Sequence, residues 1–167
     1  KIKKVIADET TVTKLGQGVH QAKCFHPAAL GRVSAALEKY RSIIESLGVD
    51  KISAVATSAA RDVANENELL ALCARHKIPI DIISGDREAN MTFLGAVSDV
   101  EDKEGVAVID VGGGSTELIL QSKGKLIGGS VNVGSVRLSD LFVTAHPTPA
   151  AEVAKARAYA REKFAEA

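Results

Sequence analysis

The chain has 167 residues, of which 46% are hydrophobic, and this composition excludes a disordered or collagen-like protein. Its 21 basic residues balance its 21 acidic ones, 13 against 13 up to Glu101 and 8 against 8 from Asp102 onward, so neither part has the basic excess of a non-specific nucleic-acid binder. No apolar run approaches the roughly 20 residues that cross a bilayer, and the first residues lack the apolar stretch of a signal peptide. We therefore predict a cytoplasmic protein that binds neither nucleic acid nor a membrane.

The cysteines and histidines show no pattern of a metal site. Cys24 and Cys73 lie far apart without a CxxC or Cys/His cluster, which predicts two reduced, half-buried thiols. The four histidines have neither metal-ligand spacing nor a partner acid at a fixed distance, so we expect solvated side chains; they are His20, His26, His76 and His146. With no Trp and 14 Gly, the composition is typical of an α/β protein.

The first hundred residues alternate between strand and helix patterns. Residues 2–13 mix β-branched and polar residues and predict one strand or a strand pair. Apolar residues recur every three or four positions from Pro27 to Leu47, which predicts an amphipathic helix that ends before Gly48. The elements expected next are a strand over 52–57 that is buried on both faces, a helix over 67–77, a strand over 80–83 and a helix over 86–97. This order implies right-handed crossovers and a mainly parallel sheet.

A charged stretch over 99–105 predicts a boundary between a first lobe, residues 1–101, and the start of a second lobe, residues 102–167. The second part reads as a meander of strands over 106–111, 116–121 and 126–130, with a glycine turn between the first two and a hairpin turn over 122–125. An Ala-rich helix follows from Pro149, with Thr148 as its expected cap.

The sharpest motif is Asp110-Val111-Gly112-Gly113-Gly114-Ser115-Thr116-Glu117, a strand that turns through three glycines into another strand. Such glycines let the backbone approach a ligand and direct several N–H groups at it, as in phosphate-binding loops. Asp110 suits a divalent cation or a water, and the hydroxyls of Ser115 and Thr116 add donors. A plain glycine-rich β-turn is the alternative. The motif is neither a Walker loop nor a Rossmann fingerprint.

Two further motifs follow strand ends. In Ser84-Gly85-Asp86-Arg87-Glu88, the first turn of a helix favours an ionised Glu88 that can accept a proton from water, although acids are common at helix starts for the same dipole reason. In the loop expected over 56–65, Arg61 suits bidentate phosphate binding, and a salt bridge to Asp62 or another acid is the equal alternative. The segment Gly134-Ser135-Val136-Arg137 reads either as a backbone approach to phosphate or as a turn before a helix. Open α/β sheets bind ligands at the carboxyl ends of strands, where the three main motifs converge.

Four segments in this order resemble the exopolyphosphatase/guanosine pentaphosphate phosphatase (Ppx/GppA) family: ATSAARDVAN, ISGDREA, VIDVGGGSTEL and SVNVGSVRL, with KLGQGVHQAKCF before them. The resemblance covers nearly the whole chain. It implies an α/β fold of the actin/Hsp70/sugar-kinase type (ribonuclease H-like), with two lobes and phosphate in between. It also implies Glu88 as the general base, Asp110 and Glu117 as acids around water and metal, Arg61 beside phosphate, and Gly112, Gly113, Gly114, Ser115 and Thr116 as a second phosphate loop.

Members of that family open with a strand–turn–strand phosphate loop of the type DxGSNS, and this chain begins after it, at what resembles the third strand. The second lobe normally continues beyond one helix. We therefore expect a partial form of the fold, incomplete at both ends, whose activity in isolation is doubtful.

The resemblance implies a hydrolase that releases terminal orthophosphate from inorganic polyphosphate by direct attack of water, with Mg²⁺ or Mn²⁺ as cofactor. Guanosine pentaphosphate (pppGpp) is the second substrate. A sensor that binds polyphosphate or an alarmone without turnover, and a kinase-like member of the same superfold, are the other classes. For the full-length protein a homodimer is a further expectation.

Overall fold

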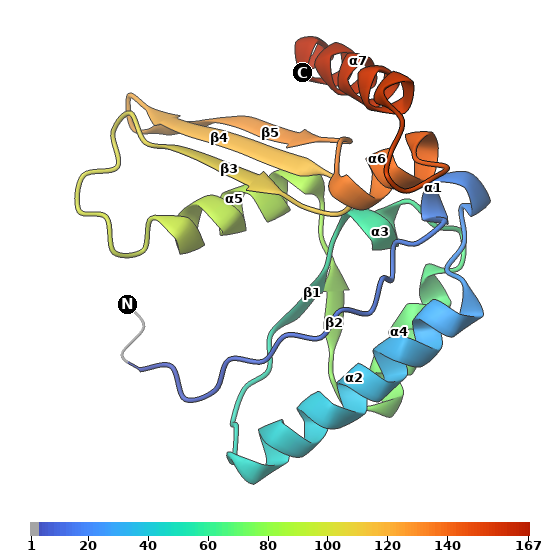
Figure 1. Cartoon of the computed structure of the whole chain (residues 1–167). Helices are drawn as coiled ribbons and strands as arrows, with labels where there is room; N and C mark the ends of the chain where they lie inside the picture. Colours follow the sequence, from blue (N-terminus) through green and yellow to red (C-terminus); the bar gives the residue numbers. More distant parts are fainter. Residues whose placement is uncertain (1–3) are drawn as a thin grey trace. The chain divides into compact units, whose positions relative to one another are not determined.

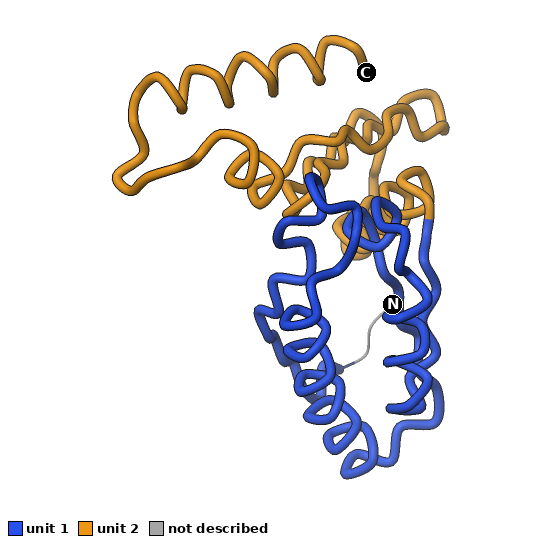
Figure 2. The backbone as a smooth tube through the Cα atoms, turned by 90° about the vertical axis from the view of Figure 1, so that its right-hand side faces the viewer, with its two compact units in different colours: residues 1–83 blue, residues 84–167 orange. Residues whose placement is uncertain are grey.

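A computed structural model describes residues 4–167 (Figure 1). The chain divides into two compact units, unit 1 up to Ile83 and unit 2 from Ser84 onward (Figure 2). The predicted lobe boundary after residue 101 lies later than this division. Helix α5 (Gly85–Ala96) lies between the two positions, and it belongs to unit 2. Where the lobes of the complete fold divide stays a prediction.

Unit 1 contains a parallel strand pair and four helices among its described residues. Its elements are α1 (Val19–Ala22), α2 (Pro27–Ser46), β1 (Ala54–Ala56), α3 (Ser58–Arg61), α4 (Glu66–Arg75) and β2 (Ile80–Ile82). The parallel pairing of β1 with β2 confirms the crossover that the sequence predicts. Pro27 begins α2, and the Nδ1 atom of His26 accepts a hydrogen bond from the backbone N–H of Ala28 at 3.1 Å. His26 is therefore a helix cap and not simply a solvated side chain.

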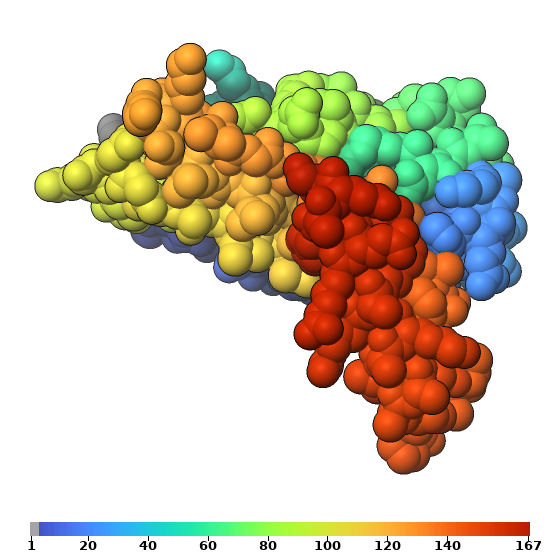
Figure 3. Space-filling model, turned by 90° about the horizontal axis from the view of Figure 1, so that it is seen from above, coloured from blue at the N-terminus to red at the C-terminus, as the bar shows by residue number. Residues whose placement is uncertain are grey.

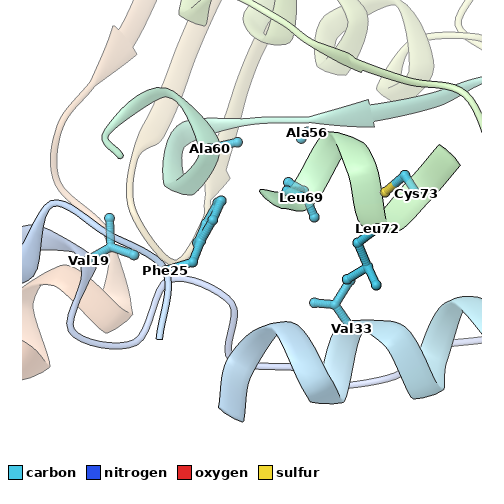
Figure 4. Packing of buried hydrophobic residues seen from close by; sticks show 8 residues of the cluster. All are labelled: Val19, Phe25, Val33, Ala56, Ala60, Leu69, Leu72 and Cys73. Atoms are coloured by element: carbon cyan, nitrogen blue, oxygen red, sulfur yellow. The ribbon is translucent and has the colours of Figure 1, made fainter. Parts of the chain in front are cut away.

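The core of unit 1 is formed by side chains from its helices, from β1 and from the segment between α1 and α2 (Figure 4). Its buried members are Val19, Phe25, Val33, Ala56, Ala60, Leu69, Leu72 and Cys73. Cys73 is 1% exposed, and burial raises the pKa of its thiol. Cys24 is exposed, and both cysteines are free. The expectation of two half-buried thiols is wrong in detail, because one lies in this core and the other lies outside it.

Two strand predictions in unit 1 are wrong. Residues 4–13 form no strand, and residues 1–3 lie outside the described part. The segment is held instead by the N–H of Arg32 Nε, which donates to the Thr13 carbonyl at 2.6 Å, and by a Lys39–Glu9 ion pair at 2.6 Å. Val55 in β1 is 37% exposed, so this strand is not buried on both faces. Both errors have one cause: β1 and β2 are the only paired strands among the described residues of unit 1, and a strand needs neighbours for its hydrogen bonds and its burial.

Unit 2 is built around a three-stranded antiparallel sheet in the order β3-β4-β5, which confirms the predicted meander. Its elements are α5, β3 (Ala107–Val111), β4 (Thr116–Ser122), β5 (Lys125–Val131), α6 (Ser135–Phe142) and α7 (Ala150–Glu166). Lys123 and Gly124 join β4 to β5 with φ of 51° and 71°, the two positive values of a type I′ hairpin turn. This turn fixes the register of β4 against β5, with Ser122 opposite Lys125.

Helix α5 covers one face of the sheet (Figure 1). Its Ala89, Phe93 and Val97 pack with Ile119 of β4 in a buried cluster. Figure 3 looks onto the opposite face of the sheet. On β3, β4 and β5, Ile109 is 66%, Leu118 43% and Ile127 57% exposed. The alternation of strand side chains thus places the buried cluster around Ile119 on the α5 side.

We expect Phe93→Ala to destabilise unit 2 by about 3–5 kcal/mol, because Phe93 is 1% exposed and its loss leaves a cavity against Ile119. Leu94→Ala on the same helix is the control, since Leu94 is 58% exposed. Urea unfolding followed by circular dichroism measures both. Equal losses in the two variants would contradict the packing of α5 described above.

The C-terminal helix α7 begins one residue later than the predicted cap implies. Pro149 and not Thr148 occupies the N-cap position, and no side chain caps the helix there. The carboxylate of Glu152, in the first turn, accepts hydrogen bonds from the hydroxyl and backbone N–H of Thr144, and these bonds lower the pKa of Glu152. Helix α7 (red in Figure 3) packs on α6, where the rings of Phe142 and Tyr159 lie 5.4 Å apart. Among residues 4–167, no helix has both the length and the apolar character to traverse a bilayer.

Candidate active site

Three polar side chains form a row across the sheet of unit 2. The strand register places Asp110 of β3 opposite Glu117 of β4, and Glu117 opposite Ser130 of β5. Side chains of directly opposite residues project from the same face of a sheet, and alternate residues share a face. Glu117 therefore projects on the same side as Ile119, which is the side that α5 covers.

Glu117 is a buried carboxylate with few partners. It is 1% exposed, and its Oε1 accepts a hydrogen bond from the hydroxyl of Ser130 at 2.6 Å. This is the one hydrogen bond that its carboxylate makes among the described residues. A buried carboxylate needs compensation on both oxygens. The second carboxylate oxygen of Glu117 could therefore be compensated by a water or a cation. The neighbouring Asp110 is exposed.

The first turn of α5 lies at the same end of the sheet. Ser84 caps the helix by accepting the N–H of Arg87 at 3.2 Å. Oδ1 of Asp86 lies 3.7 Å from the position that a Cβ on Gly129 would occupy, and Gly129 is adjacent to Ser130. Glu88 is half-buried in the same turn. Near this turn the helix and the sheet enclose a pocket of about 300 Å³, lined by Asp86, Ala89, Asn90, Ile119, Leu126 and Gly128.

The glycine turn is held by the N-terminus of α6. The backbone N–H of Ser135 donates to the Gly112 carbonyl at 3.0 Å, and the N–H groups of Val136 and Arg137 donate to the Gly113 carbonyl at 2.9 and 3.0 Å. Nε of Arg137 donates to the Gly114 carbonyl at 2.7 Å. The three glycine carbonyls are therefore all engaged by one short segment.

These contacts set the direction of the amides in the turn. In a trans peptide the N–H points opposite to the C=O, so the N–H groups of Gly113, Gly114 and Ser115 point away from the donors that hold the preceding carbonyls. None of the three makes a hydrogen bond within residues 4–167, whereas the Gly112 N–H donates to the Ser115 carbonyl at 2.9 Å. Three successive amides of a turn that lack protein acceptors are donors that an anion could accept from.

The two hydroxyl residues of the motif are buried. Ser115 is 2% and Thr116 3% exposed. The Thr116 hydroxyl donates to the Val133 carbonyl at 2.6 Å, so its one proton links β4 to the segment before α6. Phosphate binding by these two side chains stays a prediction.

Arg61 belongs to unit 1. The loop expected over 56–65 contains helix α3, and Arg61 is the last residue of that helix. Its Nη1 donates to the carbonyl of Ile83, directly after β2, at 2.9 Å. The guanidinium is thus fixed at the carboxyl ends of the parallel strands, as the sequence predicts for the motif, and its binding of phosphate stays a prediction.

The described residues supply part of the ligand set of a magnesium ion, namely two carboxylates. Among residues 4–167, no group of three or more His, Cys, Asp or Glu side chains could hold a metal by themselves. Asp110 and Glu117 supply two neighbouring carboxylates. Mg²⁺ commonly binds through one or two carboxylates, with waters and substrate phosphates as its other ligands. Two carboxylates are therefore enough for Mg²⁺, whereas a metal bound only by protein side chains would need more.

Sequence reasoning missed Ser130 as the partner of Glu117. The signal was available, because in a two-residue hairpin centred on Lys123 and Gly124 the residue opposite Glu117 is Ser130. Of the two interpretations of the segment over 134–137, the turn before a helix is correct. Its helix donors are engaged by the glycine carbonyls instead of being open to a ligand.

Known proteins of similar sequence and structure support the fold that the sequence predicts. The sequence pattern of the Ppx/GppA phosphatase family matches residues 2–167. Exopolyphosphatase 2 of Mycobacterium tuberculosis is 34% identical over 163 residues, which cover 93% of this chain and 51% of that protein. The crystal structure of an exopolyphosphatase-like protein superposes with a TM-score of 0.86 at 33% identity, covering 94% of this chain and 51% of the other. An exopolyphosphatase from Cytophaga hutchinsonii gives a TM-score of 0.86 at 27% identity, with coverages of 95% and 52%.

The chain thus spans about half the length of the relatives that it matches. Those relatives have the predicted fold of the actin and sugar-kinase type, and the mixed α/β structure of this chain corresponds to part of it. The match over residues 2–167, together with the order of the motifs, shows that the chain belongs to the Ppx/GppA phosphatase family.

Proposed function

We propose that the protein carrying this chain hydrolyses the terminal phosphoanhydride bond of inorganic polyphosphate. The observation that carries the proposal is the array of three amides, Gly113 to Ser115, in the turn that joins the strands of Asp110 and Glu117. The amides suit the charged oxygens of a phosphoryl group, and the carboxylates suit a water and a cation. The exopolyphosphatase names of two relatives support this substrate class.

In the proposed reaction Glu88 is the general base. It lies in the first turn of α5, and its carboxylate accepts a proton from the attacking water. The water attacks the terminal phosphorus in line and the bond from this phosphorus to the bridging oxygen breaks. The shortened polyphosphate departs with the bridging oxygen, and the attacked group is released as orthophosphate. The amides of the glycine turn hold the oxygens on which negative charge accumulates. This sequence of steps needs no phosphoenzyme.

We also propose Asp110 and Glu117 as the residues that hold Mg²⁺ or Mn²⁺. When bound, the ion would neutralise phosphate charge and support the departure of the leaving group. The buried carboxylate of Glu117, whose one hydrogen bond in the described chain comes from Ser130, supports this role. Phosphate binding by Arg61 is also a proposal, and it concerns unit 1 by itself.

Guanosine pentaphosphate stays the second proposed substrate, and a homodimer stays a proposal for the full-length protein. The cytoplasm is the proposed compartment, since two free cysteines are typical of a reducing environment.

The decisive assay is release of orthophosphate from inorganic polyphosphate in Mg²⁺, by this chain and by a version extended at both ends to the length of its relatives. We expect release by the extended version. Release from pppGpp alone would move the assignment to the second substrate. Binding of polyphosphate by the extended version with no release from either compound would show a sensor and refute the hydrolase.

A further inference from the structure

The segment from Gly134 to Arg137 is next to the glycine turn and takes no part in the reaction proposed above. Its backbone and side-chain donors engage the carbonyls of Gly112, Gly113 and Gly114 in succession. No other segment in the described part of the chain donates to these three carbonyls. The position of the turn therefore depends on this segment.

The two backbones approach too closely for any side chain at residue 134. A Cβ on Gly134 would lie 2.4 Å from the carbonyl oxygen of Gly113 and 2.6 Å from the nitrogen of Gly114. Gly134 has extended backbone angles, so glycine is required here for space and not for a left-handed conformation. Any larger residue at position 134 would therefore push the glycine turn away from the N-terminus of α6.

Arg137 completes the contact with a side chain. It is 8% exposed, and its Nε donates to the Gly114 carbonyl at 2.7 Å, a charge-assisted bond. The N–H of Ser115 belongs to the same peptide as that carbonyl and points the opposite way. An anion on the far side of the turn would benefit from the cation behind it.

We propose that Arg137 is a positioning residue that aims the amides of Gly114 and Ser115 at a phosphate group, with Gly134 providing the close approach that lets it do so. Arg137 acts through the backbone and does not touch the substrate. This inference rests on the proposed function, because it takes phosphate as the ligand of the turn.

The test is a titration of the ¹⁵N-labelled chain with inorganic tripolyphosphate, followed by the amide resonances of Gly113, Gly114 and Ser115. In the parent chain we expect all three to shift. In Arg137→Met we expect roughly tenfold or greater loss of affinity, the cost of a hydrogen bond that involves a charged group, and loss of the Ser115 shift, because the side chain holds only the Gly114 carbonyl. Arg157→Met on the exposed side of α7 is the matched control and keeps the parent response.

The variant Arg137→Lys distinguishes the effect of the hydrogen bond from Nε from the effect of the positive charge. Lysine keeps the cation but has no donor at the Nε position, so we expect the Ser115 shift to stay lost. Full recovery in this variant would mean that charge alone acts, and would overturn the proposal. So would a parent-like response of Arg137→Met, or absence of shifts in the parent chain.

If Arg137→Met fails to fold, Gly134→Ala serves as the second variant, with Gly95→Ala as its control because a Cβ on Gly95 has no atom within 4 Å. We expect the amide shifts to be lost in the former and kept in the latter, and shifts kept in both would overturn the proposal. Amide shifts in this chain without phosphate release by the extended version would refute the proposed hydrolysis and leave the positioning role standing.

Discussion

In Glu88→Gln we expect phosphate release from polyphosphate to fall about 10²–10⁴-fold, the usual cost of removing a general base. Glutamine keeps the size of the side chain and its place in the first turn of α5, but it cannot accept a proton from water. Substrate affinity should persist, because the proposed phosphate ligands are the amides of the glycine turn. The measurement is steady-state release of orthophosphate by the extended version, together with tripolyphosphate binding by the variant.

The control for this variant is Asp86→Asn, in the same helical turn. Both acids interact favourably with the helix dipole, so both substitutions should lower stability by a similar amount, about 0.3–1 kcal/mol. Only Glu88→Gln should lower turnover strongly. Equal, small effects of the two substitutions would show that Glu88 is an ordinary helix-start acid and would exclude it as the base.

In Glu117→Gln we expect the affinity for divalent cations to fall by about tenfold or more, and phosphate release to fall with it. The amide keeps the shape of the carboxylate and its contact with the Ser130 hydroxyl, so packing around the 1% exposed side chain is preserved. What is lost is a negative charge beside Asp110. The uncharged side chain also removes a buried charge, so the variant should be at least as stable as the parent.

Cation binding is measured on the chain itself with Mn²⁺, which broadens amide resonances near its site, and calorimetry with Mg²⁺ gives the affinity. Glu162→Gln, an exposed substitution on α7, is the control and should leave both readouts unchanged. If resonances of β3 and β4 in Glu117→Gln broaden at the same Mn²⁺ concentration as in the parent chain, Glu117 is not a ligand of the metal.

Much of the site could be predicted from local sequence, because its parts are local. The glycines between Asp110 and Glu117 make a turn between two strands wherever that segment is placed. The two-residue turn at Lys123 and Gly124 fixes the pairing of the next strand, and with it the position of Ser130. The helical period predicts α2 to within a residue at either end.

Other features depend on contacts between distant residues. Residues 4–13 have a strand-like composition but form no strand, since pairing needs a neighbour that local sequence cannot supply. The sequence also does not show that Glu117 is buried. Its apolar neighbour Leu118 projects from the other face of the sheet and is the more exposed of the two residues. Helix α5 decides which face of the sheet becomes the core.

The sequence by itself therefore determined the family, the helix α2 and the strand meander of unit 2. Only the tertiary structure decided how the glycine turn is held. Its carbonyls meet donors more than twenty residues later in the chain, at Ser135, Val136 and Arg137. Local propensity specifies that a turn forms, whereas the direction of its amides follows from the hydrogen bonds that its carbonyls accept, and those come from elsewhere in the fold.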